Sequence, residues 1–235
     1  MERRDQWIRD LCAGKSFADI GGLWGTVNEK VTVAAKAGAV TTVMLDVQAP
    51  EHALWAALQE RCLSMGVSGC GCVSASIDEP CLVERTGHFD VVHCSGLLYH
   101  CPNPLHTLTQ LRSITLNYLI LTTVVIPSTI SNSSGTINLS PGGLLFVPYL
   151  PKHQLETLRE HWENAEVSGA IGITEQHCGW QVDDYAPWWW LFPVGTVRQL
   201  LMAAGFRILE DCAHWGGNAH SFLASAVEPA IGSPT

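Results

Sequence analysis

The sequence predicts an α/β fold built on a doubly wound, mostly parallel sheet. Three observations support this prediction: buried-type apolar runs alternate with amphipathic stretches, a glycine-rich turn follows the first run, and a hairpin pattern comes near the end. The chain has 235 residues, of which 47% are hydrophobic and 15% charged. That length suffices for one domain with a sizeable core. We therefore expect a single domain over residues 1–235.

The functional prediction depends on the first strand and the turn after it. Residues 17–20 suit a strand buried on both faces. Gly21, Gly22 and Gly25 follow, and glycine permits a tight turn or a close approach of the backbone to a ligand. Residues 26–37 then predict a helix. A strand, a glycine turn and a helix N-terminus together suit a nucleotide-like ligand, although two such glycines also fit an ordinary turn.

A second apolar run, residues 41–47, carries Asp46 near its end. A carboxylate roughly 20 residues past the glycines suits the two hydroxyls of a ribose. The dinucleotide fingerprint G-x-G-x-x-G is not met, because counting from Gly21 places Leu23 and Thr26 where glycine is required. The strand and the carboxylate would also suit a Rossmann dehydrogenase, but the missing fingerprint disfavours a dinucleotide as the ligand.

The remaining elements follow from apolar spacing and from helix start and stop signals. Residues 128–135 predict a polar loop, since serine, threonine and asparagine dominate them. We expect helices over 4–13, 50–65, 104–116, 151–164 and 193–204, strands over 70–76, 89–94 and 118–126, and a closing hairpin from 206–212 and 218–227.

Two stretches resemble the class I S-adenosylmethionine-dependent methyltransferases. Asp19, followed by Gly21 and Gly25, resembles their D-x-G-x-G-x-G signature, with Leu23 in place of the middle glycine. Residues 88–105 resemble their fourth strand and following loop, F-D-x-V-x-x-x-G-x-L-Y-H. This second likeness is nearest to the subset that contains the tRNA wobble-uridine carboxymethyltransferases and related small-molecule methyltransferases.

The resemblance implies a Rossmann-like, seven-stranded, mostly parallel sheet with an antiparallel C-terminal hairpin and an inserted lid over 128–192 before the sixth strand. It also implies S-adenosylmethionine as the cofactor. Asp78 is the choice for the adenine amino group, because a carboxylate accepts from an amine, and a solvated loop acid is the alternative. The implied cofactor-binding residues are Asp19, Gly21, Gly22, Gly25, Asp46, Ser76, Ile77, Asp78 and Ser95.

Tyr99 and His100 are the candidate catalytic residues, since they follow the fourth strand, where this family commonly places substrate-facing groups. Histidine could take a proton from a phenol, acid or amine, and the alternative is that both residues only pack the loop. His93 lies within the strand and is expected to be a satisfied core histidine. No spacing predicts a metal site, because Cys70 and Cys72 have no second pair.

Trp188, Trp189 and Trp190 are the candidate substrate-binding residues. Three adjacent rings cannot all face one core, so at least one should face a pocket or solvent. Aromatic walls suit a flat aromatic substrate or a cationic amine. An anchor for the lid, or a contact in a homodimer, accounts for the run equally well.

Charge and cysteine usage restrict the partners. The formal net charge of −9 disfavours a nucleic-acid backbone, so a small-molecule substrate is expected. Nine scattered cysteines fit reduced thiols in a cytoplasmic protein, and neither a targeting segment nor a membrane span is predicted. The leading function is methyl transfer to an oxygen or nitrogen of a small molecule. The alternatives are a tRNA-modifying transferase and a non-catalytic S-adenosylmethionine-binding protein.

Overall fold

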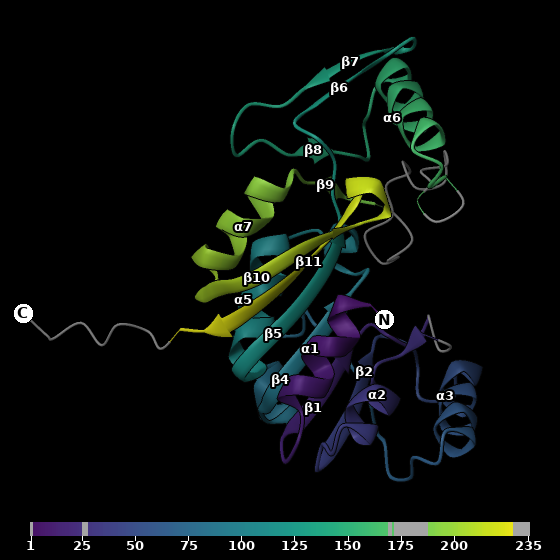
Figure 1. The fold of residues 1–235 in the computed structure, drawn as a ribbon, viewed down its shortest axis with the longest axis vertical. Coiled ribbons are helices and arrows are strands. Elements are labelled where there is room, and N and C mark those ends of the chain that lie inside the picture. Colours follow the sequence, from purple (N-terminus) through teal and green to yellow (C-terminus); the bar gives the residue numbers. More distant parts are fainter. Residues whose placement is uncertain (1, 25–27, 169–170, 172–187, 228–235) are drawn as a thin grey trace, which may run out of the picture.

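The computed structural model of the chain describes residues 2–24, 28–168, 171 and 188–227. Its centre is a seven-stranded sheet with the order β10-β11-β5-β4-β1-β2-β3 (Figure 1). The strands of this sheet are β1 (Ser16–Ile20), β2 (Thr41–Asp46), β3 (Gly71–Ser74), β4 (Phe89–Ser95), β5 (Thr115–Val124), β10 (Phe206–His214) and β11 (Ala219–Ala226).

Strand directions confirm the predicted fold class. β1 pairs in parallel with both β2 and β4, and β4 pairs in parallel with β5. Only β11 runs against its neighbours, β5 and β10. The carboxyl ends of the parallel strands therefore share one edge of the sheet, and the strand order changes direction along the chain at β1, where such folds bind ligands.

Helices cover both faces of the sheet. On one face, α1 (Arg3–Leu11), α2 (Val31–Lys36) and α3 (Ala53–Ser64) pack on a core that includes Phe17 and Met44. On the other face lie α4 (Leu82–Thr86), α5 (Pro104–Ile114) and α7 (Val194–Ala203). α1 also contacts β10, because Arg3 and the indole Nε1 of Trp7 both donate hydrogen bonds to the carboxylate of Glu210.

The segment between β5 and α7 forms a layer of its own beyond the carboxyl ends of the strands (Figure 1). Its core contains Leu158, Trp162 and Trp188 and continues into Val124 and Ile126 at the end of β5. It consists of the hairpin β6 (Thr129–Asn132) and β7 (Gly135–Asn138), the helix α6 (Lys152–Asn164), and the short pair β8 (Leu145–Phe146) and β9 (Trp190–Leu191). Residues 169–170 and 172–187 of the expected lid lie outside the described residues.

One local prediction was wrong, and two predicted helices are present but begin later than expected. The polar loop expected over 128–135 is instead the hairpin of β6 and β7, which turns Ile130 and Ile137 into the core of the segment. The helix expected over 26–37 begins at Val31, with Lys30 at its N-cap position, and the Glu29 carboxylate accepts the backbone N–H of Thr32 in its first turn. The helix expected from residue 50 begins at Ala53, and the ring of His52 caps it.

Candidate active site

The glycine turn has the conformation that the sequence predicted. Gly21 directly follows β1 and has a φ of +73°, which a side chain would strain. Its N–H donates to the Leu45 carbonyl at 2.8 Å, which holds the turn against β2. A Cβ on Gly21 would meet the Leu97 side chain at 3.5 Å, so the turn faces the loop that follows β4. Gly25, predicted as part of this turn, lies outside the described residues.

Asp19 is buried against the glycine turn and hydrogen-bonds to the groups around it. Its side chain is 1% exposed; Oδ1 lies 2.7 Å from His93 Nδ1, and Oδ2 accepts the Lys30 N–H at 2.8 Å. Gly22 packs directly on this carboxylate, because a Cβ there would lie 2.6 Å from Asp19 Oδ2. Asp19 bonds protein groups that fix the turn and the approach to α2, and its contact with a cofactor stays a prediction.

His93 is only half satisfied. Its Nδ1 bonds Asp19, but Nε2 is buried and has no hydrogen-bond partner in the described part of the chain. The expectation of a satisfied core histidine therefore holds for one ring nitrogen alone.

Asp46 ends β2 beside the glycine turn. Oδ2 accepts the N–H of Leu23 at 3.2 Å and Oδ1 accepts that of Gln48 at 3.2 Å. Burial raises the pKa of this carboxyl, and its backbone N–H donors oppose the rise. The side chain of Leu23 is fully buried in the core, so the residue that replaces the middle glycine turns away from the turn.

The loop after β3 contains the predicted adenine contacts. Ile77 is buried in the core, while the Ser76 hydroxyl accepts the N–H of Asp78 at 3.1 Å. Asp78 Oδ1 accepts from the Thr107 hydroxyl at 2.6 Å, and its carbonyl bonds His106 Nε2 at 3.2 Å. The carboxylate chosen for an exocyclic amine is thus tied to α5.

Ser95, Tyr99 and His100 lie at the end of β4 and in the short helix η2 (Leu98–His100). The Ser95 hydroxyl accepts from Arg4 Nη1 at 3.0 Å, so α1 reaches over this strand end. The Tyr99 hydroxyl would lie 3.7 Å from a Cβ on Gly96, the residue after β4. Burial raises the pKa of Tyr99 to about 12, so its hydroxyl remains a neutral hydrogen-bond donor at physiological pH.

The tryptophan run joins the inserted segment to this loop. The ring centroids of Trp188 and Tyr99 are 4.5 Å apart, the Trp189 N–H donates to the Tyr99 carbonyl at 2.8 Å, and Trp190 Nε1 donates to the Pro102 carbonyl at 3.0 Å. Trp188 and Trp189 are each 6% exposed, and Trp190 is half-buried. Packing thus accounts for the first two rings, and Trp190 is the ring with surface left for a ligand.

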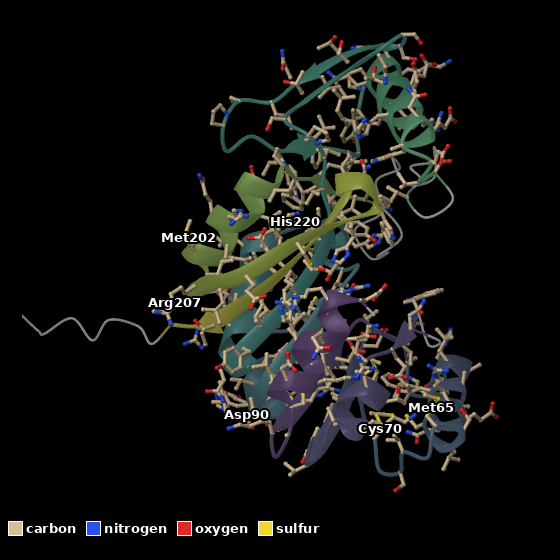
Figure 2. All side chains as sticks on the ribbon, viewed as in Figure 1. Met65, Cys70, Asp90, Met202, Arg207 and His220 are labelled. Carbon is tan, nitrogen blue, oxygen red and sulfur yellow. The ribbon has the colours of Figure 1, made fainter. Side chains whose placement is uncertain are left out.

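A row of polar side chains that was not predicted from the sequence lies across the same edge. Ser95 is paired in register with Thr122, Thr122 with Ser221, and Ser221 with Cys212. The sequence signal for this row is the presence of serine and threonine inside otherwise apolar strands. Polar side chains are uncommon in buried strands, and those that occur there need hydrogen-bond partners. Figure 2 shows this edge at His220, next to Ser221, and the opposite edge at Asp90, where β4 begins.

Among the described residues, no group of three or more histidine, cysteine, aspartate or glutamate side chains is arranged to hold a metal ion. The described helices include none with both the length and the hydrophobicity needed to span a bilayer.

No family model matches the sequence, and no curated protein matches it. Solved structures do. The magnesium protoporphyrin IX methyltransferase of Synechocystis PCC 6803, with bound S-adenosylhomocysteine, is 15% identical over 95% of this chain and 81% of that chain, with a TM-score of 0.57. The N-terminal domain of EvdMO1, with bound S-adenosylhomocysteine, is 15% identical over 97% and 82%, with a TM-score of 0.54. A ribosomal protein L11 methylase from Lactobacillus delbrueckii is 13% identical over 96% and 78%, with a TM-score of 0.52. This chain therefore has the fold of the class I S-adenosylmethionine-dependent methyltransferases.

Proposed function

We propose that this chain is an S-adenosylmethionine-dependent methyltransferase whose acceptor is an oxygen or nitrogen atom of a small molecule. The observation that carries the proposal is the meeting of the Gly21 turn and the Asp46 carboxylate at the carboxyl edge of a methyltransferase-type sheet. That edge is where open α/β sheets bind nucleotides.

The residues present fit this cofactor. The Asp46 carboxylate accepts the backbone N–H groups of Leu23, Val47 and Gln48, and a carboxylate has about four acceptor sites, so it can still accept from a ribose hydroxyl. Leu23 leaves the turn open because its side chain lies in the core. We place the adenine beside Ile77 and Asp78, and the methionine portion between the glycine turn and Ser95.

When bound, the sulfonium supplies an already activated methyl group, so the protein mainly orients the acceptor and excludes water. Tyr99, His100 and Trp190 are the residues we assign to the acceptor. The Tyr99 phenol remains protonated and so donates a hydrogen bond, while the half-buried Trp190 ring offers an aromatic wall. The inserted segment that carries Trp190 would then close over the bound acceptor.

Calorimetry with S-adenosylmethionine and S-adenosylhomocysteine tests the proposal. Both should bind the wild type, and Asp46→Ala should lose about 1.5–3 kcal/mol, or roughly 10- to 150-fold in affinity, because a hydrogen-bonded charged group is removed. Asp90→Asn is the matched control, since this carboxylate lies at the opposite edge of the sheet. Unchanged affinity in a folded Asp46→Ala variant would remove Asp46 from the site.

The two alternatives differ in measurable ways. A tRNA-modifying transferase is disfavoured by the net charge of −9, and its likeness is confined to the motif at residues 88–105. A non-catalytic binder would bind the cofactor without turnover. Release of S-adenosylhomocysteine with small-molecule acceptors, with bulk tRNA, or with neither separates the three functions.

A further inference from the structure

The polar row has a hydrogen-bonded histidine at one end. His214 Nε2 lies 2.7 Å from the Ser221 hydroxyl, and the Ser221 hydroxyl lies 2.7 Å from that of Thr122. Thr122 and Ser221 are buried, whereas His214 is half-buried at the end of β10. If His214 Nε2 donates to Ser221, the lone pair resides on Nδ1, which has no hydrogen-bond partner among the residues that the structure describes.

An arginine occupies the other end of the row. Arg4 is only 15% exposed; its Nη1 donates to Ser95, and its Nη2 pairs with the half-exposed Glu2 at 2.8 Å. The Arg4 Nε atom is buried and has no hydrogen-bond partner in the described part of the chain. Neighbouring strands are about 4.8 Å apart, so the row from Ser95 to Cys212 spans roughly 14 Å.

The charged groups around His214 favour its neutral form. Burial lowers the pKa of His214 most, and the Arg4 guanidinium lowers it further. The Glu2 carboxylate opposes this, and His220 adds a small lowering. Cys212 Sγ, at 3.4 Å, is the other titratable group against the ring. A neutral imidazole at pH 7 can accept a proton.

We propose that Arg4, Ser95, Thr122, Ser221 and His214, called here the Arg4–His214 row, line the methyl-acceptor site, with Arg4 and His214 at its two ends, and that the acceptor is a hydroxyl group whose proton passes to His214 Nδ1. This inference rests on the proposed function. An acceptor oxygen lone pair forms the new C–O bond, the S–C bond of the sulfonium breaks with its electron pair left on sulfur, and the O–H proton goes to the imidazole.

The positive charge of Arg4 favours oxygen over nitrogen as the acceptor atom for the methyl group. Negative charge that develops on an acceptor oxygen is stabilised by a neighbouring guanidinium. A neutral amine instead acquires positive charge as it attacks, which the same guanidinium opposes. Burial strengthens both effects, because the Arg4 side chain is largely removed from water.

Imidazole NMR of histidine-labelled protein tests the electrostatics without turnover. Relative to wild type, the pKa of His214 should rise in Arg4→Gln, which removes a positive neighbour, and fall in Glu2→Gln, which removes a negative one. His88, exposed in the turn before β4, serves as the reference signal and should be unaffected by either substitution. If the pKa of His214 is the same in Arg4→Gln as in the wild type, the proposal is overturned.

The acceptor class is tested with 4-methylphenol and 4-methylaniline, which match in shape. In the presence of S-adenosylhomocysteine, 4-methylphenol should shift the His214 signals, and with S-adenosylmethionine it should be methylated in preference to 4-methylaniline. His214→Gln should lower kcat/KM by about 100-fold or more, the usual contribution of a general base, whereas His88→Gln should not.

Preferred methylation of 4-methylaniline, an unchanged rate in folded His214→Gln, or His214 signals that do not respond to 4-methylphenol would each overturn the inference. A loss confined to His100→Gln would also overturn it, by assigning the base to η2. Calorimetry keeps the two proposals apart, because failure of the wild type to bind S-adenosylhomocysteine contradicts the proposed function itself.

Discussion

Gly22→Ala tests whether the Asp19 carboxylate is fixed beneath the glycine turn. An added Cβ would lie 2.6 Å from Asp19 Oδ2 and 3.0 Å from Met44 Cε. The methyl end of Met44 can move aside, since it is the tip of a flexible side chain. Asp19 cannot move freely, because Lys30 N–H holds Oδ2 at 2.8 Å and His93 lies 2.7 Å from Oδ1.

The expected cost follows from these bonds. Moving the carboxylate of Asp19 breaks at least one hydrogen bond to a charged group, worth about 1.5–3 kcal/mol. Replacing glycine also restricts the unfolded chain, which returns about 0.4–1 kcal/mol. The free energy of unfolding of Gly22→Ala should therefore fall by roughly 0.5–2.5 kcal/mol.

Urea unfolding followed by tryptophan fluorescence measures this difference, provided that the slope against urea stays unchanged. Gly195→Ala is the matched control: Gly195 lies in α7, and an added Cβ there meets no atom within 4 Å. That variant should be as stable as the wild type or slightly more so. Equal stability of the two variants would refute the rigid Asp19–His93 support.

Two further predictions concern stability. Trp188→Ala should lower the free energy of unfolding by about 3–5 kcal/mol, because the ring is 6% exposed and packs on Tyr99. Trp190→Phe should lower it only by the value of the indole hydrogen bond, about 0.5–1.5 kcal/mol. Equal melting temperatures of the two variants would contradict this assignment. The backbone N–H of Ser16 and other hydrogen bonds hold the pKa of Asp90 below its usual value of 3.8, so the stabilisation is present above that value and is lost as the pH falls through the lower, folded pKa. In Asp90→Asn the free energy of unfolding should therefore fall less steeply as the pH is lowered. Urea titrations at several pH values measure this, and the same pH dependence as in the wild type would contradict the prediction.

The centre of the main sheet was predictable because its middle strands are largely buried on both faces. β4 and β5 appear in the sequence as continuous apolar runs, a pattern typical of strands in the middle of a parallel sheet. The β6–β7 hairpin was not predictable, since each strand has four residues and only Ile130 and Ile137 turn inward. Such strands are stabilised by α6 beneath them rather than by their own pattern.

The site was predictable only where local sequence determines it. The positive φ of Gly21 and the place of Asp46 follow from a short motif. The pairing of Asp19 with His93 joins residues 74 positions apart, and only the parallel register of β1 and β4 brings them together. The same applies to the Arg4–His214 row, whose members come from α1 and four strands.

The contact of α1 with β10 affects how the chain folds during synthesis. Arg3 and Trp7 bond Glu210, which is 207 and 203 positions further along the chain. At about 5–20 residues per second, a ribosome needs roughly 10–40 seconds to add that many residues. Throughout that interval Arg3 and the indole N–H of Trp7 lack their carboxylate partner. The contact of α1 with β10 therefore forms late, with a large loop-closure cost, and destabilising β10 should loosen the first helix as well as the last hairpin and make both more sensitive to proteases.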